Sequence, residues 1–255
     1  MDLGAMWDFL TDPASWQGPS GLGTQLVQQL LLTVTALAVA AGVGLPIALL
    51  AGHHGRGGWL AINLSNLGRA VPTFALLALL ARFSWPGSAE FGPYGRAGLA
   101  TLLALVFFAL PPIIAQAYVA VREVPEDLRD AARGLGHSEW QVFRAVEWPL
   151  ALPLVVSGLR LALVQVWATA TIAALVGGPG LGNIIRLGFA DLDRRSQALA
   201  GALLVAVVAL VLESAGALVQ RAVTPPHAGG GSPRRNGRRM RLGSAQSRAP
   251  REEPA

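Results

Sequence analysis

The chemistry open to this chain is limited first by the residue types it lacks. Its 255 residues include no cysteine, and all 20 basic residues are arginine. Cysteine nucleophiles, thiolate metal ligands, Schiff-base lysines and the lysine of a phosphate-binding P-loop are therefore excluded. The four histidines lie in loops and the C-terminal tail without metal-ligand spacing, at His53, His54, His137 and His227. We therefore expect no ATP hydrolysis through a P-loop of its own. An enzyme would need a convergent set of nucleophile, base or metal ligands, and the sequence supplies none, so we expect neither an enzyme nor a cofactor bound by this chain.

Three ionisable residues lie within apolar stretches, where a charge is costly unless it has a partner or water. Arg69 is followed by Pro72, which breaks a helix and frees carbonyl groups that a guanidinium can satisfy. These two residues are candidates for the lining of a transport pathway, and a structural tie between helices is the alternative. Arg160 has the same two interpretations. Glu213 could be a proton site, but its place near the end of an apolar stretch favours a solvated or inter-subunit carboxylate.

The composition assigns these stretches to a membrane. Hydrophobic residues make up 53% of the chain and charged residues only 14%, which is too apolar for an ordinary soluble domain. A bilayer core of roughly 30 Å needs about 20 apolar residues of helix. Five segments meet this requirement, at about 26–51, 59–83, 97–121, 150–176 and 198–219. We predict an all-α polytopic membrane protein with about five transmembrane helices, or six if the interrupted second segment forms two pieces.

The distribution of arginine predicts the orientation. With the N-terminus outside, the inner segments at 52–58, at 122–148 and from 221 onward carry most of the arginines, as cytoplasmic loops do. No basic residue precedes the first span, so we predict an uncleaved helix rather than a signal peptide. The expected organisation is N-out and C-in, with four parts: an extracytoplasmic segment 1–24, a membrane domain 25–223, its cytoplasmic loop 122–149 and a disordered basic tail 224–255. Much of the net charge of +5 comes from that tail, and no nucleic-acid partner is predicted.

The loop at 122–149 has the pattern of two short helices. Pro125 and two acids suit a first helical turn, and an apolar stripe follows at Leu128, Ala131, Ala132 and Leu135. Gly134 and Gly136 end this helix. Ser138 and Gln141 then form a predicted capping box for a second helix, and Pro149 precedes the fourth span. Such a compact unit can insert into a groove on another protein, whereas the alternative is an amphipathic loop lying on lipid headgroups.

The residues of this loop carry a resemblance to a known family. Asp130-Ala131-Ala132, three residues, Gly136, nine residues, Val146, one residue, Trp148 and Pro149 is similar to the signature loop of ABC importer permeases. The family pattern is Glu-Ala-Ala, three residues, Gly, nine residues, Ile, one residue, Leu-Pro, so the spacing matches while three residue types differ. The resemblance implies that residues 130–149 dock into a separate ATP-hydrolysing subunit, which would bind the ATP and Mg²⁺.

Two further segments resemble the osmoprotectant branch of that family, which imports glycine betaine, carnitine or choline. Residues 69–77 are similar to Gln-Thr-Ile-Pro-Ser-Leu-Ala-Leu-Leu in those permeases, with Arg69 in place of a polar amide. Residues 168–174 and 177–182 look like the fourth span and gate segment. From the residues themselves, Thr169 and Thr171 permit close helix packing, and the glycines at 178, 180 and 182 indicate a tight turn at the outer face that could belong to a gate. Trp167 is expected to face lipid or to be packed, rather than to bind a cation.

The resemblance implies a multi-pass permease subunit with the type I ABC importer fold in the bacterial inner membrane. Its expected partners are an ABC ATPase, a second permease subunit that is identical or paralogous, an extracytoplasmic substrate-binding protein and the lipid bilayer. The expected cargo is a quaternary-ammonium osmoprotectant. An ABC permease for an amino acid such as methionine is the alternative, followed by an ion-coupled carrier, although neither inverted repeats nor a buried acid pair at mid-membrane are evident.

Overall fold

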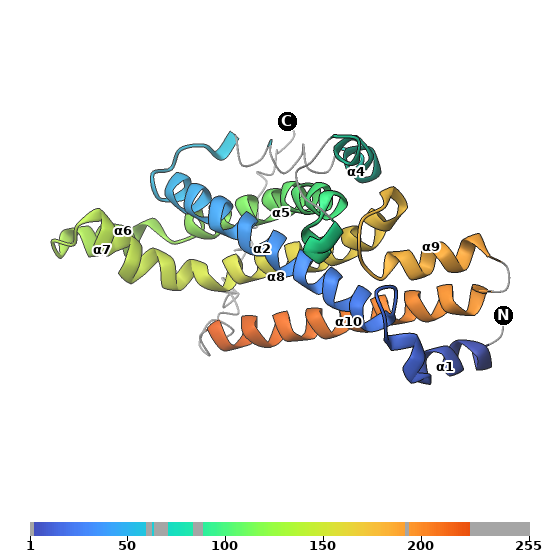
Figure 1. Ribbon diagram of the computed structural model, residues 1–255. Helices are drawn as coiled ribbons and strands as arrows, with labels where there is room; N and C mark the ends of the chain where they lie inside the picture. The colour runs from blue at the N-terminus through green and yellow to red at the C-terminus, as the bar shows by residue number, and fades with distance from the viewer. Residues whose placement is uncertain (1–2, 60–62, 64–70, 84–88, 192–193, 225–255) are drawn as a thin grey trace, which may run out of the picture. The chain divides into compact units, whose positions relative to one another are not determined.

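Figure 1 shows a computed structural model that describes residues 3–59, 63, 71–83, 89–191 and 194–224. Every regular element in this part of the chain is helical. The elements, in order, are α1 (Leu3–Thr11), η1 (Pro13–Trp16), α2 (Leu22–His53), α4 (Thr73–Ala81), η2 (Ala89–Tyr94), α5 (Arg96–Arg122), α6 (Glu126–Gly134), α7 (Glu139–Val142), the π-helical turn η3 (Phe143–Glu147), α8 (Trp148–Ala173), η4 (Ala174–Val176), α9 (Gly182–Ala190) and α10 (Arg195–Val223).

Four helices within the described residues are long and apolar enough to cross a membrane. They are α2, α5, α10 and the helical run that continues from Glu139 to Val176. These helices correspond to four of the five predicted spans. Three of them agree with the expected bounds to within about four residues at each end, whereas the run that starts at Glu139 begins 11 residues before the predicted start at 150. Most of the predicted second span at 59–83, including Arg69, lies outside the described residues. Its described part is residues 59, 63 and 71–83, and Pro72 is the N-cap of α4, as expected of a residue that interrupts a span.

The core forms where α2, α5 and α8 pack along one another through small side chains. On α2 the buried face repeats every four residues, at Ala36, Ala40, Gly44 and Ala48. A Cβ on Gly44 would lie 3.2 Å from the Ile114 side chain, and one on Gly158 of α8 would lie 2.6 Å from Gln116 Cβ. Small residues let membrane helices approach closely where apolar burial alone cannot drive association, since lipid is equally apolar.

Helix α10 packs on α8, and the pair is joined by a polar cluster. Arg160 Nε lies 2.8 Å from Glu213 Oε1, and Arg160 also donates to Gln220 Oε1 at 3.0 Å. A charged pair between two apolar helices compensates for the desolvation that either charge alone would suffer. The structure therefore favours the structural tie for Arg160, and it pairs Glu213 with Arg160 within one chain while 38% of the Glu213 side chain stays exposed.

The fourth predicted span needs a correction at its start. We predicted a second short helix in the loop, with Pro149 at the entry into the fourth span. Pro149 does lie at the start of α8, but α7, η3, α8 and η4 form one uninterrupted helical run. Proline removes a backbone donor and its ring clashes with the preceding turn of an α-helix. The wider π-helical turn at Phe143–Glu147 ends two residues before Pro149, so the hydrogen-bond pattern changes there without breaking the helix.

Two short helices were not predicted. The segment before the first span contains α1, whose Phe9 and Leu10 pack on a cluster formed by Leu22, Trp167 and Leu181. Helix α9 follows the glycine-rich turn and packs against α10. In Figure 1, α6 and α7 lie at one end of the long helices, whereas α1 and α9 lie at the other. We call these the knob end and the gate end.

Candidate functional site

The knob comprises α6, α7 and the π-helical turn η3, residues 126–147. Helix α6 starts after Pro125 with Glu126 and Asp127 in its first turn, and Gly136 adopts a left-handed conformation with φ of +85° just beyond its end. In α7 the Ser138 N–H donates to Gln141 Oε1 at 2.8 Å, as part of a capping box. The predicted helix starts, glycine turn and capping box of this loop are therefore confirmed.

The knob exposes a set of apolar side chains. Leu135 is 81% exposed and Trp140 is 64% exposed, while Leu128 and Ala131 are also open. Ala132, which belongs to the apolar stripe predicted for this helix, is instead buried against the rest of the chain, so the exposed part of the stripe is Leu128, Ala131 and Leu135. Large exposed apolar residues on a charged loop indicate a surface that either another protein or the membrane covers.

Charged side chains tie the two helices of the knob together. Arg133 donates to Glu139 at 2.9 and 3.1 Å, and to Asp130 at 3.0 Å. These hydrogen bonds, first from Glu139 and then from Asp130, raise the pKa of Arg133 above its ordinary value. The other signature residues continue along the chain: Val146 is half-buried in η3, and Trp148 and Pro149 open α8.

His53 was predicted as an isolated loop residue, and this prediction is wrong. It forms the last residue of α2, with its side chain only 10% exposed, and its Nδ1 lies 2.7 Å from Glu147 Oε2 in the knob. No cluster of metal-ligating side chains occurs among the residues that the structure describes. His53 thus connects the knob to a membrane helix by a hydrogen bond.

The gate end is organised around a loop at residues 177–182, which we call the gate loop. Two glutamines of α2 hold it. Gln25 Oε1 accepts the Gly180 N–H at 2.9 Å, and Gln29 Oε1 accepts the Leu181 N–H at 2.9 Å. The Gln29 amide also donates to Trp167 O at 3.2 Å and to Thr171 Oγ1 at 2.8 Å. Gln29 is fully buried, so this one side chain joins α2, α8 and the gate loop.

The glycines of the gate loop are required by the backbone conformation at one position and by neighbouring atoms that leave no space for a Cβ at two others. Gly180 has φ of +122°, which L side chains rarely adopt. A Cβ on Gly182 would lie 2.0 Å from the Thr171 carbonyl oxygen, and one on Gly178 would lie 2.6 Å from Thr101 Oγ1. The structure therefore brings Thr171, Gly178, Gly180 and Gly182 to one place. Thr169 is buried on α8, and Trp167 is packed as expected, with its indole N–H donating to Val205 O at 3.0 Å.

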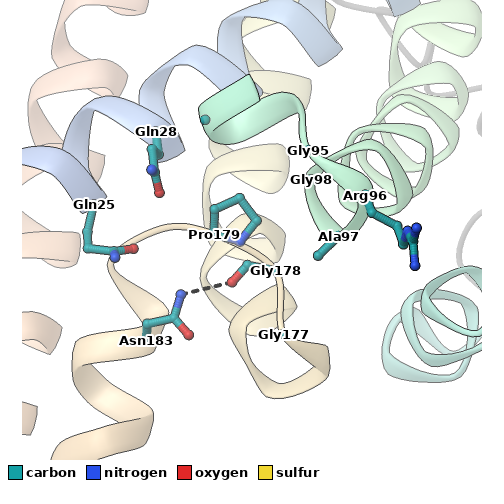
Figure 2. Close-up of a pocket in the computed structure, with 11 residues that line it drawn as sticks. Gln25, Gln28, Gly95, Arg96, Ala97, Gly98, Gly177, Gly178, Pro179 and Asn183 are labelled. Carbon is teal, nitrogen blue, oxygen red and sulfur yellow. Dashed lines mark hydrogen bonds between the residues drawn. The ribbon is translucent and has the colours of Figure 1, made fainter. Parts of the chain in front are cut away.

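A cavity of about 550 Å³ opens beside the gate loop (Figure 2). Gln25 and Gln28 of α2 line one side of it, and Arg96 at the start of α5 lies on the other. The Asn183 side chain, in the first turn of α9, donates to Gly178 O at 2.9 Å and so stabilises the turn of the gate loop. The wall is polar on the α2 side and mostly glycine backbone elsewhere, so small polar molecules have space next to the gate loop.

The two gate glutamines were missed by the sequence analysis. Gln25, Gln28 and Gln29 are polar residues at the start of an otherwise apolar span, which is the available signal. A buried amide in a membrane helix must find a partner. The partner is the backbone of a loop about 150 residues away, and nothing local in the sequence identifies it.

Replacing Gln29 with leucine is expected to release the gate loop. The buried Leu181 N–H would lose its acceptor, and an unsatisfied buried donor costs about 1–3 kcal/mol. With the gate role that the resemblance implies for this loop, a loss of that size should lower substrate uptake about tenfold. Gln28→Leu is the matched control, because Gln28 lines the cavity beside the same loop. Equal uptake by the two variants would contradict the assignment of Gln29.

Comparison with known proteins identifies the family and several relatives of this chain. Residues 44–225 match the family described as binding-protein-dependent transport system inner membrane component. The chain is 33% identical to the osmoprotectant import permease protein OsmW of Salmonella typhimurium strain LT2, over 75% of this chain and 86% of the relative. It is 31% identical to the carnitine transport permease protein OpuCB of Listeria monocytogenes, over 79% of this chain and 87% of the relative.

Solved structures show the same fold. A chain of the MetNI methionine ABC transporter in an inward-facing conformation matches with a TM-score of 0.66 and 22% identity, covering 78% of this chain and 94% of that one. A chain from an amino acid ABC transporter crystallised with histidines matches with a TM-score of 0.65 and 19% identity, covering 87% and 99%. Members of the matched family are multi-pass components of the bacterial inner membrane that work with an ATPase and a substrate-binding protein, and they transport rather than catalyse. The extent of the family match and the identity to its curated relatives show that this chain belongs to the binding-protein-dependent transport system inner membrane components, as an ABC importer permease.

Proposed function

We propose that this chain is the permease subunit of an ATP-driven importer for a quaternary-ammonium osmoprotectant of the glycine betaine, carnitine and choline class. The observation that carries the proposal is the similarity to permeases named for osmoprotectants and carnitine, which extends along three quarters of the chain. The two methionine and amino-acid transporters support only the fold, because their identity is lower. An extracytoplasmic binding protein would deliver the substrate.

The knob is proposed to be the site where the ATPase docks. Its exposed Leu135 and Trp140 offer apolar contacts, and Asp130 adds a charged group beside them. Gly136 sets the angle between the two knob helices, while Val146, Trp148 and Pro149 join the knob to α8. ATP and Mg²⁺ would bind to the ATPase. In a transporter with two permease subunits, each knob would contact one ATPase, and closure of the two ATPases would move both knobs. The predicted orientation, with the N-terminus outside, places the knob in the cytoplasm.

The gate loop is proposed to close the opposite end of the pathway. Its hydrogen bonds to Gln25 and Gln29 link α2, α8 and α9, so a relative shift of these helices must change the loop. Pro72, Thr169 and Thr171 remain candidates for the pathway wall. We further propose that two permease subunits, identical or paralogous, enclose the pathway between them, because a single chain with about five spans has few helices with which to surround a solute.

Reconstitution tests the proposed substrate. The chain, its ATPase and its binding protein in liposomes should accumulate radiolabelled glycine betaine, carnitine or choline when ATP is enclosed with the ATPase, and uptake should stop without ATP. The same liposomes with labelled methionine provide the comparison. Selective uptake of methionine or another amino acid would reject the osmoprotectant assignment. Uptake driven by an ion gradient without ATP would instead support a coupled carrier.

A further inference from the structure

The knob contains one fully buried carboxylate. Glu147, the last residue of the π-helical turn η3, has no exposed surface. A buried charge is tolerated only when it is paired. Its partners come from two other elements: His53 Nδ1 at the end of α2 lies 2.7 Å from Glu147 Oε2, and Arg129 Nε of α6 lies 3.1 Å from Glu147 Oε1.

The same cluster reaches a third membrane helix. The Arg129 guanidinium, itself nearly buried, donates to the Val121 carbonyl oxygen in the last turn of α5. Nearby, α2 and α5 touch so closely that a Cβ on Gly52 would lie 2.9 Å from Val121 Cβ. Since η3 continues directly into α8, the knob ends of α2, α5 and α8 all meet at the side chains of Glu147, Arg129 and His53.

Aromatic rings connect this buried cluster to the surface of the knob. The exposed Trp140 ring stacks on Phe143 with centroids 5.6 Å apart, and Phe143 meets the His53 ring edge-on at 5.7 Å. A force applied to Trp140 therefore acts on His53 through a single intervening ring.

We propose that Glu147, Arg129 and His53 form a transmission junction, which carries movement of the knob to α2, α5 and α8 together. These three are positioning residues for ATP-driven transport, and they are distinct from the exposed side chains of the docking surface. This inference rests on the proposed function, because it assumes that the ATPase acts on the knob.

The contact between Arg129 Nε and Glu147 Oε1 is an ion pair that lacks hydrogen-bond alignment. Although Arg129 Nε and Glu147 Oε1 are 3.1 Å apart, neither atom has a hydrogen bond to any described residue. Attraction between charges depends weakly on angle, whereas a hydrogen bond weakens steeply when bent. The Arg129–Glu147 pair can thus stay attracted while the elements carrying it rotate. If rigidity alone were needed, well-packed apolar residues would serve as well or better.

The test measures substrate moved per ATP hydrolysed, in the complete reconstituted transporter with whichever substrate the wild-type protein takes up. For Glu147→Gln we expect normal co-purification of the ATPase and ATP hydrolysis within about twofold of wild type, with at least about a tenfold fall in substrate per ATP. Glu126→Gln is the matched control, since it neutralises an exposed acid in the same knob and should leave the ratio unchanged. An unchanged ratio in Glu147→Gln would overturn the proposal.

A second variant separates transmission from folding. The double substitution Arg129→Met with Glu147→Leu removes both charges at similar volume, so neither is left buried without a partner. We expect it to assemble with the ATPase and remain uncoupled. Restored coupling would show that the cluster is replaceable packing and overturn the proposal, as would failure of both variants to bind the ATPase. Failure of the proposed function would appear differently, as an absence of ATP-driven osmoprotectant uptake in the wild-type protein.

Discussion

Combining Gly136→Val with Asp130→Arg is expected to abolish ATP-driven uptake by detaching the ATPase. Gly136 has φ of +85°, a conformation that a β-branched residue adopts only with strain of roughly 1–3 kcal/mol. Relief of that strain would change the angle between α6 and α7. Reversing the charge at Asp130 replaces its contact with Arg133 by repulsion and changes the exposed face of α6. Co-purification of the ATPase with the permease measures the loss directly.

The control for this prediction is Gly134→Ala. Gly134 is the last residue of α6, and a Cβ there would meet no atom within 4 Å. That variant should bind the ATPase and support uptake like the wild type. If the double variant still carried the ATPase and imported substrate at the normal rate, the knob would not be the docking site.

Gly182→Ala is expected to have the largest effect at the gate end. The added Cβ would lie 2.0 Å from the Thr171 carbonyl oxygen and 2.8 Å from Ala174 Cβ, so backbone has to move. Overpacking of this kind costs about 1–3 kcal/mol and occasionally more. We expect a clearly lower unfolding temperature and loss of uptake, measured by thermal unfolding in detergent and by transport in liposomes.

Gly42→Ala provides the comparison within an apolar span. Gly42 lies inside α2, and its Cβ would have no atom within 4 Å. Alanine is favoured over glycine in a helix by about 1 kcal/mol, so this variant should be as stable as the wild type or more stable. An unfolding temperature of Gly182→Ala equal to that of Gly42→Ala would show that the gate loop is not tightly packed.

The sequence predicted the parts of the fold whose signals are local. Apolar length identified α5 almost to the residue, as 97–121 against Arg96–Arg122. In the knob, the residues that start and end the helices lie within a few positions of each other, and the capping box at Ser138 and Gln141 is one such signal. Periodicity could not show that Pro149 lies within a continuous helix, because the π-helical turn that accommodates it has no distinctive composition.

The parts that escaped prediction depend on distant contacts. In the sequence, Gln29 is only a polar residue within an apolar run. Its role follows from the folded structure, where it accepts the Leu181 N–H. His53 and Glu147 are 94 residues apart in the chain, and each is a polar residue close to an apolar span with no local signal that it is buried. Their pairing follows only from the packing of α2 against α5 and of α5 against α8. The tail at 225–255 and Arg69 lie outside the described residues, so their predicted roles stay predictions.

Helix α2 contacts both the gate loop and the knob. Its first turns hold the gate loop through Gln25 and Gln29, and its last residue, His53, holds the knob. The helix continues from Leu22 to His53 despite Pro46 within it. At about 1.5 Å per residue, Gln29 and His53 are roughly 36 Å apart along the axis, so a tilt of about 5° about the midpoint would displace each end by about 1.6 Å. The two displacements have opposite signs, as with a lever on a central pivot. If α2 tilts as a rigid body, movement of the knob in one direction therefore moves the gate loop in the opposite direction.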